Sequence, residues 1–188
     1  MDFRKNSSGI FQFRSWDESQ LVHGFTTRTT GNFRQLRSLG FLESVLGLDH
    51  MSLSMLTQVH SNRLIVKRDS QLTEHLEADG LLTNVPGCAL GIRTADCFAI
   101  LLADAKASCI AAVHAGWRGT LAKITSLIIE RMVGEFGARA ERIEALVGPG
   151  IESCCFEVGE DVSSKFKNKF ICEGSRNPRV DLREANRV

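Results

Sequence analysis

Four short apolar runs in the middle of the chain constrain its fold more than any other feature of the sequence. Each run is nearly continuous in hydrophobicity and is bounded by turn residues, which is typical of strands buried on both faces. The runs lie at residues 80–83, 89–92, 98–102 and 109–113. Because residues 104–107 form only a short connection between the last two runs, these two runs predict an antiparallel hairpin.

Further strands and helices are predicted on both sides of this core. The additional strands are expected at residues 25–28, 55–59, 63–67 and 143–147. Helices are expected at residues 33–46, from Thr120 as a cap to Gly137 as a stop, along the apolar positions of residues 158–170, and from residue 181 onward. Strands and helices do not alternate strictly. We therefore expect an α/β fold of the α+β type, a single domain with a mixed β-sheet flanked by helices.

Length and charge limit the possible functions. The 188 residues fit one domain, and a formal net charge of +1 gives no field that would attract nucleic acid or an anionic membrane. The first residues lack the apolar core of a secretory signal, so we expect a cytoplasmic protein. The six cysteines show no spaced framework, and we expect most of them, the adjacent Cys154 and Cys155 included, to be packing residues. The sequence does not indicate an oligomeric state.

Three separated residues could form a metal site. Cys97 opens one strand of the expected hairpin, and His114 closes the other, so both side chains should lie at the same end of the pair. His60 lies at a strand end or on a tight connection, from which its side chain can reach a cleft. Two imidazoles and a thiolate would leave one position of a zinc ion open, as catalytic zinc sites commonly do.

Other polar residues accompany these three. Asp96 could handle protons as a general acid or base, orient a ligand imidazole, or accept backbone hydrogen bonds. Arg28, Arg93 and Arg118 lie at strand ends or on the turns that follow, where they are either solvated surface charges or a clamp for phosphate. Trp117 is either a core anchor or a platform for a flat base. We expect Asp96 and Arg118 to act in catalysis, and Arg28, Arg93 and Trp117 to bind substrate.

Four segments resemble, in order and spacing, those of the YfiH-type family, once described as multicopper polyphenol oxidoreductase laccases. They are Gln-Val-His at 58–60, Thr-Ala-Asp-Cys at 94–97, His-Ala-Gly-Trp-Arg-Gly at 114–119, and Gly-Pro-Gly-Ile at 148–151 through Phe-Glu-Val at 156–158. The resemblance implies a fold similar to that of the cytotoxic necrotising factors. It also implies a zinc-dependent purine nucleoside phosphorylase and adenosine deaminase, with His60, Cys97 and His114 as zinc ligands and with purine nucleoside and phosphate as substrates.

Two departures from the family pattern stand out. Between Arg28 and His60 the chain is shorter, and the family's Ser-Leu-Asn-Leu-Gly segment is reduced to Ser-Leu-Gly at residues 38–40. The family also continues with further strands beyond the region that matches here. We therefore expect residues 1–188 to form a catalytic domain that lacks the family's C-terminal segment.

Three alternatives to a zinc enzyme remain. Cys97 activated by His114 would make a metal-free cysteine hydrolase or deamidase. The chain could also keep zinc as a structural staple, or bind nucleosides without turnover. A copper laccase is disfavoured, because five histidines cannot supply a multicopper cluster together with an electron-transfer site.

Overall fold

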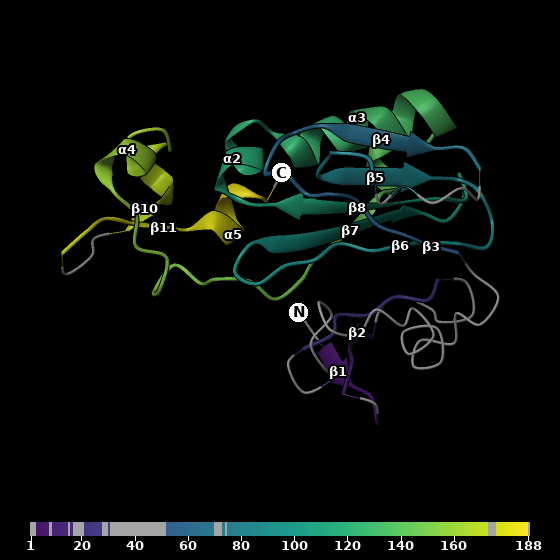
Figure 1. Ribbon diagram of the computed structural model, residues 1–188, viewed down its shortest axis with the longest axis horizontal. Helices are drawn as coiled ribbons and strands as arrows, with labels where there is room; N and C mark the ends of the chain where they lie inside the picture. The colour runs from purple at the N-terminus through teal and green to yellow at the C-terminus, as the bar shows by residue number, and fades with distance from the viewer. Residues whose placement is uncertain are drawn as a thin grey trace. The chain divides into compact units, whose positions relative to one another are not determined.

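The computed structural model describes most of the chain and divides it into two compact units (Figure 1). The first unit consists of Met1–Leu53 and Pro86–Ala89, and the second of Ser54–Val85 and Leu90–Val188. The described residues are 3–7, 9–14, 16, 21–27, 30, 52–69, 73, 75–172 and 176–187. The helix expected at residues 33–46 and the expected phosphate ligand Arg28 lie outside them.

The first unit contains a small hairpin. Strands β1 (Phe3–Lys5) and β2 (Phe11–Phe13) pair in antiparallel fashion, and the rings of Phe3 and Phe13 lie 4.1 Å apart. A strand was expected at residues 25–28, but in its described part only Phe25 pairs, as an isolated bridge to Phe11. Strand β3 (Ser52–Ser54) pairs with strand β6 (Cys88–Leu90).

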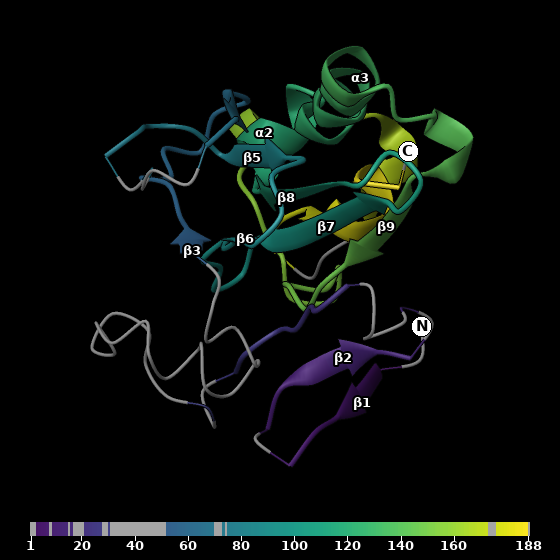
Figure 2. The same cartoon turned by 90° about the vertical axis from the view of Figure 1, so that its right-hand side faces the viewer.

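The second unit is built on a five-stranded sheet in the order β4-β5-β8-β7-β9. Figure 2 labels four of these strands, β5, β8, β7 and β9. Strand β4 runs parallel to β5, and the other neighbours are antiparallel, which confirms the expected mixed sheet. The strands are β4 (Leu64–Lys67), β5 (Gly80–Thr83), β7 (Phe98–Asp104), β8 (Cys109–Ala115) and β9 (Glu144–Val147). The strand expected at residues 55–59 does not form, since only Thr57 pairs, with Glu77.

The expected hairpin of β7 and β8 is confirmed. Its register pairs Asp104 with Cys109 at the turn, and Phe98 with Ala115 at the open end. At the open end Ala99 also faces His114. Both strands are buried along almost their whole length, and helix α3 (Ile124–Phe136) covers one face of the sheet (Figures 1 and 2).

The helix expected from Thr120 to Gly137 is divided into two. Helix α2 (Trp117–Leu121) ends at Ala122, and Lys123 adopts the left-handed conformation with φ of 56° before α3 begins. The continuous 3.6-residue pattern concealed this break, because Leu121 and Ile124 still pack on the same core. Gly137 ends α3 as expected, in the left-handed conformation that glycine adopts without strain.

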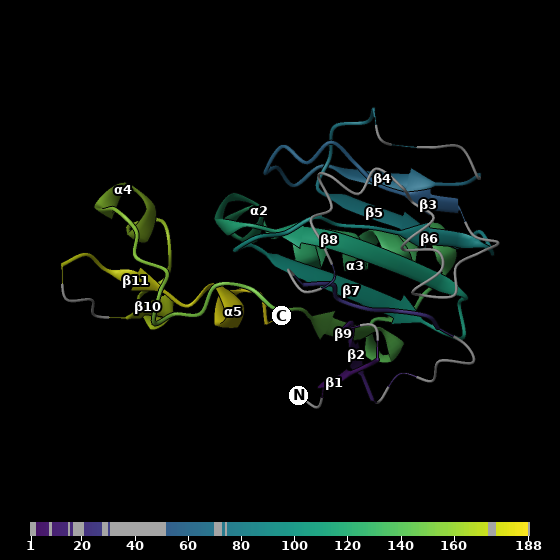
Figure 3. The same ribbon diagram turned by 60° about the horizontal axis from the view of Figure 1, so that its bottom comes forward.

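The C-terminal part of the chain lies beyond one end of the sheet, the end next to which α2 lies (Figure 3). The single helix expected over residues 158–170 is wrong: α4 (Glu160–Ser163) is one turn long, and the extended backbone of Lys167 separates it from a 3-10 turn at Asn168–Phe170. Strands β10 (Ile171–Cys172) and β11 (Arg179–Val180) then pair, and α5 (Leu182–Ala185) follows. As expected, a helix begins after Asp181, whose carboxylate accepts a hydrogen bond from the Glu184 amide.

None of the helices in the described residues is long and apolar enough to cross a membrane.

A buried ion pair fixes the turn of the β7–β8 hairpin to the segment before β9. The Asp104 side chain is completely buried and accepts hydrogen bonds from the Arg142 guanidinium and from the amide of Arg139. These contacts, that from Arg142 foremost, hold the pKa of Asp104 at about 2, below its ordinary value of 3.8. The pair therefore stabilises the fold fully above about pH 4, and this stabilisation is lost as the pH falls towards 2.

We expect Asp104→Asn to lower the free energy of unfolding by about 3 kcal/mol at pH 7, because it leaves the partly exposed Arg142 guanidinium without the buried carboxylate that it pairs with. Urea denaturation measures the change. Glu77→Gln, which removes the exposed Arg63–Glu77 pair, is the control and should cost less than about 0.5 kcal/mol. Equal losses in both variants, or an Asp104→Asn deficit that does not shrink between pH 4 and pH 2, would contradict this account.

Candidate metal centre

The structure brings the three predicted ligands together. One ligand atom from each of His60, Cys97 and His114 lies within 4.8 Å of the others, so a small movement would place all three on one ion. Cys97 directly precedes β7 and His114 is near the end of β8, so the hairpin register places both at one end of the sheet. His60 comes from the loop before β4, and its ring lies edge-to-face against that of His114, with centroids 4.7 Å apart.

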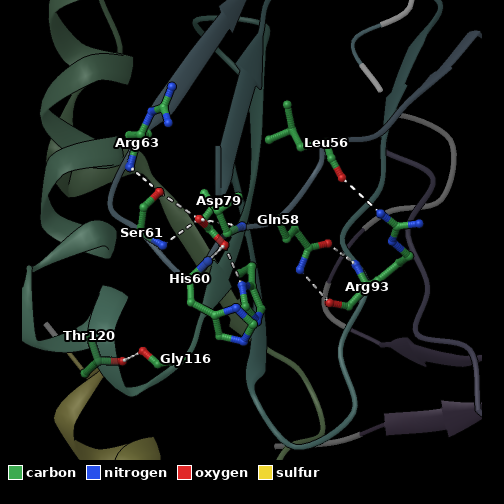
Figure 4. Close-up of polar contacts among 11 residues, drawn as sticks. Leu56, Gln58, His60, Ser61, Arg63, Asp79, Arg93, Gly116 and Thr120 are labelled. Carbon is green, nitrogen blue, oxygen red and sulfur yellow. Dashed lines mark hydrogen bonds and ion pairs between the residues drawn. The ribbon is translucent and has the colours of Figure 1, made fainter. Parts of the chain in front are cut away.

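A single carboxylate shapes the loop that carries His60. The Asp79 side chain accepts hydrogen bonds from three consecutive backbone amides, those of residues 59–61, and from the Ser61 hydroxyl (Figure 4). His60 itself adopts a left-handed backbone conformation with φ of 57°, which costs a residue with a side chain about 1–2 kcal/mol. The bonds to Asp79 compensate for this strain and fix the direction of the His60 side chain.

The same carboxylate orients His114. Asp79 Oδ1 lies 2.7 Å from His114 Nδ1, and the Asp79 carbonyl accepts a hydrogen bond from the His114 amide at 2.7 Å. Burial lowers the pKa of His114 below its ordinary value, against the opposing effect of Asp79, so the imidazole is kept neutral. With Nδ1 occupied by Asp79, Nε2 remains for an ion, which is the arrangement that metal-binding histidines usually show.

Asp79 resists protonation although it is completely buried. Burial alone would raise its pKa, but the hydrogen bonds from His114 and Ser61 outweigh it and hold the pKa below the ordinary value. Sequence reasoning missed this residue and considered Asp96 as the partner of a ligand imidazole. The sequence signal that could have found it is an acidic residue directly before the apolar run of β5. A carboxylate at the start of a buried strand is itself expected to be buried, and it then needs several hydrogen-bond donors.

The environment of Cys97 favours the protonated thiol unless a cation is bound. Burial, together with the negative charges of Asp96 and Asp79, raises the pKa of the Cys97 thiol. A cation close to the sulfur reverses this effect, because a coordinating thiol is deprotonated outright. The donor set and its surroundings therefore fit a soft or borderline divalent ion such as zinc.

Gly116 leaves the space in which the three ligand side chains meet. A Cβ atom on this residue would lie 3.0 Å from Cys97 Sγ, 3.4 Å from His60 Cδ2 and 3.8 Å from His114 Cε1. Its carbonyl accepts a hydrogen bond from the Thr120 hydroxyl at 2.9 Å, which ties it to helix α2 (Figure 4).

Gln58 fixes the loop that leads to Cys97. Its side-chain amide makes two hydrogen bonds with the backbone of Arg93, one accepted from the Arg93 amide at 2.8 Å and one donated to its carbonyl at 2.7 Å (Figure 4). The Arg93 guanidinium, expected to bind substrate, donates to the Leu56 carbonyl at 3.1 Å. Arg93 also lines a cavity of about 250 Å³ with Met55, Leu56 and Thr57.

The remaining predicted residues directly precede Cys97 or follow Gly116 in the chain. Asp96 is exposed directly before Cys97, and its carbonyl accepts a hydrogen bond from the Ile151 amide at 2.7 Å. Arg118 is exposed on α2, with its guanidinium 4.2 Å from the centre of the Trp117 ring, and Lys165 lies 5.4 Å from the same ring. The Trp117 ring packs against the core while half-buried, and the Arg118 and Lys165 side chains lie over it. The ring thus contacts the core, as an anchor would, and a base that stacked on the same side as these cations would have to displace them.

The fold is similar to that of a solved bacterial protein. The Bacillus licheniformis hypothetical protein YfiH superposes with a TM-score of 0.84 at 25% sequence identity, over 98% of this chain and 81% of that protein. This similarity confirms the expected YfiH-like fold.

Sequence comparison places the chain in a family. The profile of the multi-copper polyphenol oxidoreductase laccase family matches residues 22–188, and the chain belongs to that family. A purine nucleoside phosphorylase of Deinococcus radiodurans is 41% identical over 151 residues, which are 78% of this chain and 58% of that protein. Adenosine deaminase RL5, from an unknown prokaryotic organism, is 39% identical over 76% of this chain and 60% of its own length. The chain thus spans about three fifths of these two relatives.

We expect Gly116→Ala to weaken Zn²⁺ binding about tenfold, because the added methyl group would lie 3.0 Å from the Cys97 sulfur and force this ligand atom to shift. Competition with a chromophoric chelator measures the affinity. Gly134→Ala is the matched control, since its Cβ meets nothing within 4 Å in the middle of α3 and should raise helix stability by about 0.5–1 kcal/mol. Unchanged zinc affinity in Gly116→Ala would show that the ion does not bind among these three side chains.

Proposed function

We propose that the protein is a purine nucleoside phosphorylase that also deaminates adenosine, and that His60, Cys97 and His114 hold a zinc ion at its active site. The observation that carries the proposal is the open set of three donors within 4.8 Å, with Asp79 behind His114. Structural zinc sites are closed by four protein ligands, whereas catalytic sites keep a position for water or substrate. The names of the two relatives supply the substrate class: nucleoside with phosphate for one, adenosine for the other.

Zinc bound there would supply Lewis acidity, which activates water or polarises a substrate group near neutral pH. The residues of the chain provide the rest. Burial keeps His114 neutral, and Asp79 holds its imidazole in the correct orientation. Asp79 also holds the His60 loop in a conformation that the backbone would not otherwise adopt. Asp96, exposed beside Cys97, is placed to move protons during deamination at C6 of the purine.

Phosphorolysis needs phosphate near the ribose C1′, where it displaces the purine base. We assign phosphate binding to Arg118, whose guanidinium is exposed on α2 only two residues after Gly116. Arg28 and Arg93 complete the proposed set of cations, and Trp117 is assigned to the nucleoside side of the pocket. Stacking of Arg118 on the Trp117 ring limits the orientations of the guanidinium, so less entropy is lost when it binds an anion.

The main rival is a metal-free hydrolase with Cys97 as nucleophile. Such an enzyme needs a thiolate, and therefore a thiol pKa that lies below the ordinary value. The pKa of Cys97 is raised instead, through burial and the charges of Asp96 and Asp79. Asp79 also occupies His114 Nδ1, which leaves that imidazole suited to a ligand role. Both observations favour the metal enzyme.

The purified protein should contain one zinc ion per chain and release hypoxanthine from inosine only when phosphate is present. Removal of zinc by a chelator should abolish this release and the production of ammonia from adenosine, and added Zn²⁺ should restore both. Metal analysis and chromatographic product assays measure the outcomes. Cys97→Ser should lose zinc and both activities, whereas Cys172→Ser, a half-buried cysteine outside the site, should keep them.

Three results would overturn the proposal. Metal-free protein whose only reactive group is Cys97 would support the hydrolase. Activity that survives complete removal of metal would exclude a catalytic role for zinc. Stoichiometric zinc without consumption of any nucleoside would leave the ion as a structural staple.

Two carboxylates near the site should differ in their effects. Asp96→Asn should retain zinc and lower kcat for adenosine deamination by about 10²–10⁴-fold, because it removes a proton-transfer group. Asp79→Asn should instead weaken zinc binding about 10–100-fold, because it disturbs the orientation of His114 and the His60 loop. Zinc titration and steady-state kinetics on both variants separate these roles. Loss of zinc in Asp96→Asn, with none in Asp79→Asn, would reverse the assignment.

A further inference from the structure

Two adjacent cysteines share one side of an exposed turn. Successive side chains on an extended strand point in opposite directions, yet the sulfur atoms of Cys154 and Cys155 lie only 3.3 Å apart. The turn after β9 brings them together, since the Glu152 carbonyl accepts hydrogen bonds from the amides of Cys155 at 2.9 Å and Phe156 at 3.1 Å. Both cysteines are exposed, so the expectation that they serve in packing is wrong.

The other cysteines have different surroundings. Cys88 and Cys109 are buried, as expected for packing residues, Cys172 is half-buried, and Cys97 belongs to the candidate metal centre. In the part of the chain that the structure describes, Cys154 and Cys155 are therefore the two exposed thiols.

Contacts with the core hold the turn in place. The Glu152 carboxylate accepts a hydrogen bond from the Arg183 guanidinium at 2.7 Å, and this guanidinium lies 4.9 Å from the centre of the buried Phe98 ring. On the other side, the Ile151 amide donates to the Asp96 carbonyl at 2.7 Å. The two thiols are thus presented together by an anchored segment, which raises the effective concentration of each for the other.

We propose that Cys154 and Cys155 form a redox-active dithiol that a small-molecule disulfide oxidises to a disulfide bond between the two residues. Cys154, as the thiolate, attacks one sulfur of the oxidant and forms a mixed disulfide, and the first small thiolate leaves. Cys155 then loses its proton and attacks the Cys154 sulfur, which releases the second small thiolate. The two protein thiols lose two electrons and two protons in total, and the oxidant becomes two thiols.

Several properties support this chemistry. The hydrogen bond shared with Cys154 raises the pKa of Cys155, which fits Cys155 as the proton donor of the pair and as the second thiol to react. Both sulfurs are open to solvent, so a small oxidant and a small reductant can reach them. A disulfide between neighbours closes almost no loop and therefore gains little from chain entropy, which keeps it reversible. The inference is independent of the proposed nucleoside chemistry.

Oxidised glutathione is the probe for this site. The protein is incubated with it under native conditions, remaining thiols are alkylated, and tryptic peptides are weighed by mass spectrometry. The peptide of residues 143–165 contains Cys154 and Cys155 and no other cysteine. We expect this peptide to lose two hydrogens and both alkylation sites, and to regain them after treatment with a thiol reductant.

Single variants test the order of events. In Cys155→Ser, the remaining Cys154 should accumulate as a stable mixed disulfide with glutathione, because no second thiol resolves it. Cys172→Ser is the matched control and should form the disulfide as readily as the unchanged protein. The proposal is overturned if the peptide keeps two alkylatable thiols, carries two glutathione groups, or appears only in disulfides between chains.

Discussion

The buried carboxylate of Asp79 is the constraint on which the candidate metal centre depends. It accepts hydrogen bonds from three consecutive amides of the His60 loop, from Ser61 and from His114. A buried carboxylate without hydrogen-bond donors would destabilise the fold strongly. The loop and the imidazole therefore adopt the geometry that donates hydrogen bonds to Asp79. The positions of two of the three candidate ligands, His60 and His114, therefore follow from the solvation of one buried charge directly before β5.

The sheet and the residues around it set the position of the third candidate ligand, Cys97. Cys97 stands at the open end of the β7–β8 hairpin, and the Asp104–Arg142 pair secures the opposite end. Gly116 allows the Cys97 sulfur to approach both imidazoles, and Gln58 holds the backbone before it. Each of these contacts joins segments distant in sequence, which explains why the centre is assembled only in the complete fold of the second unit.

Local sequence patterns predicted the elements whose residues interact with near neighbours. The β7–β8 hairpin, the stop at Gly137 and the helix that begins after Asp181 all followed from short-range patterns. The prediction of one helix over residues 158–170 was wrong because the spacing of apolar residues does not reveal that the backbone is extended at Lys167. Asp79 escaped notice for a related reason: its partners lie 18 to 35 residues away, and no local pattern reveals them.

The hydrogen bonds between Asp79 and the His60 loop also bear on how an ion could enter the candidate metal centre. The hydrogen bonds that shape this loop join protein groups to one another, so they form when the chain folds, whether or not an ion is at hand. In zinc fingers, by contrast, metal supply and folding are one event. If the candidate centre binds an ion, folding and metal loading are thus separate steps. An ion that enters the candidate centre would then meet a His60 loop that is already shaped, and its departure would leave these hydrogen bonds in place.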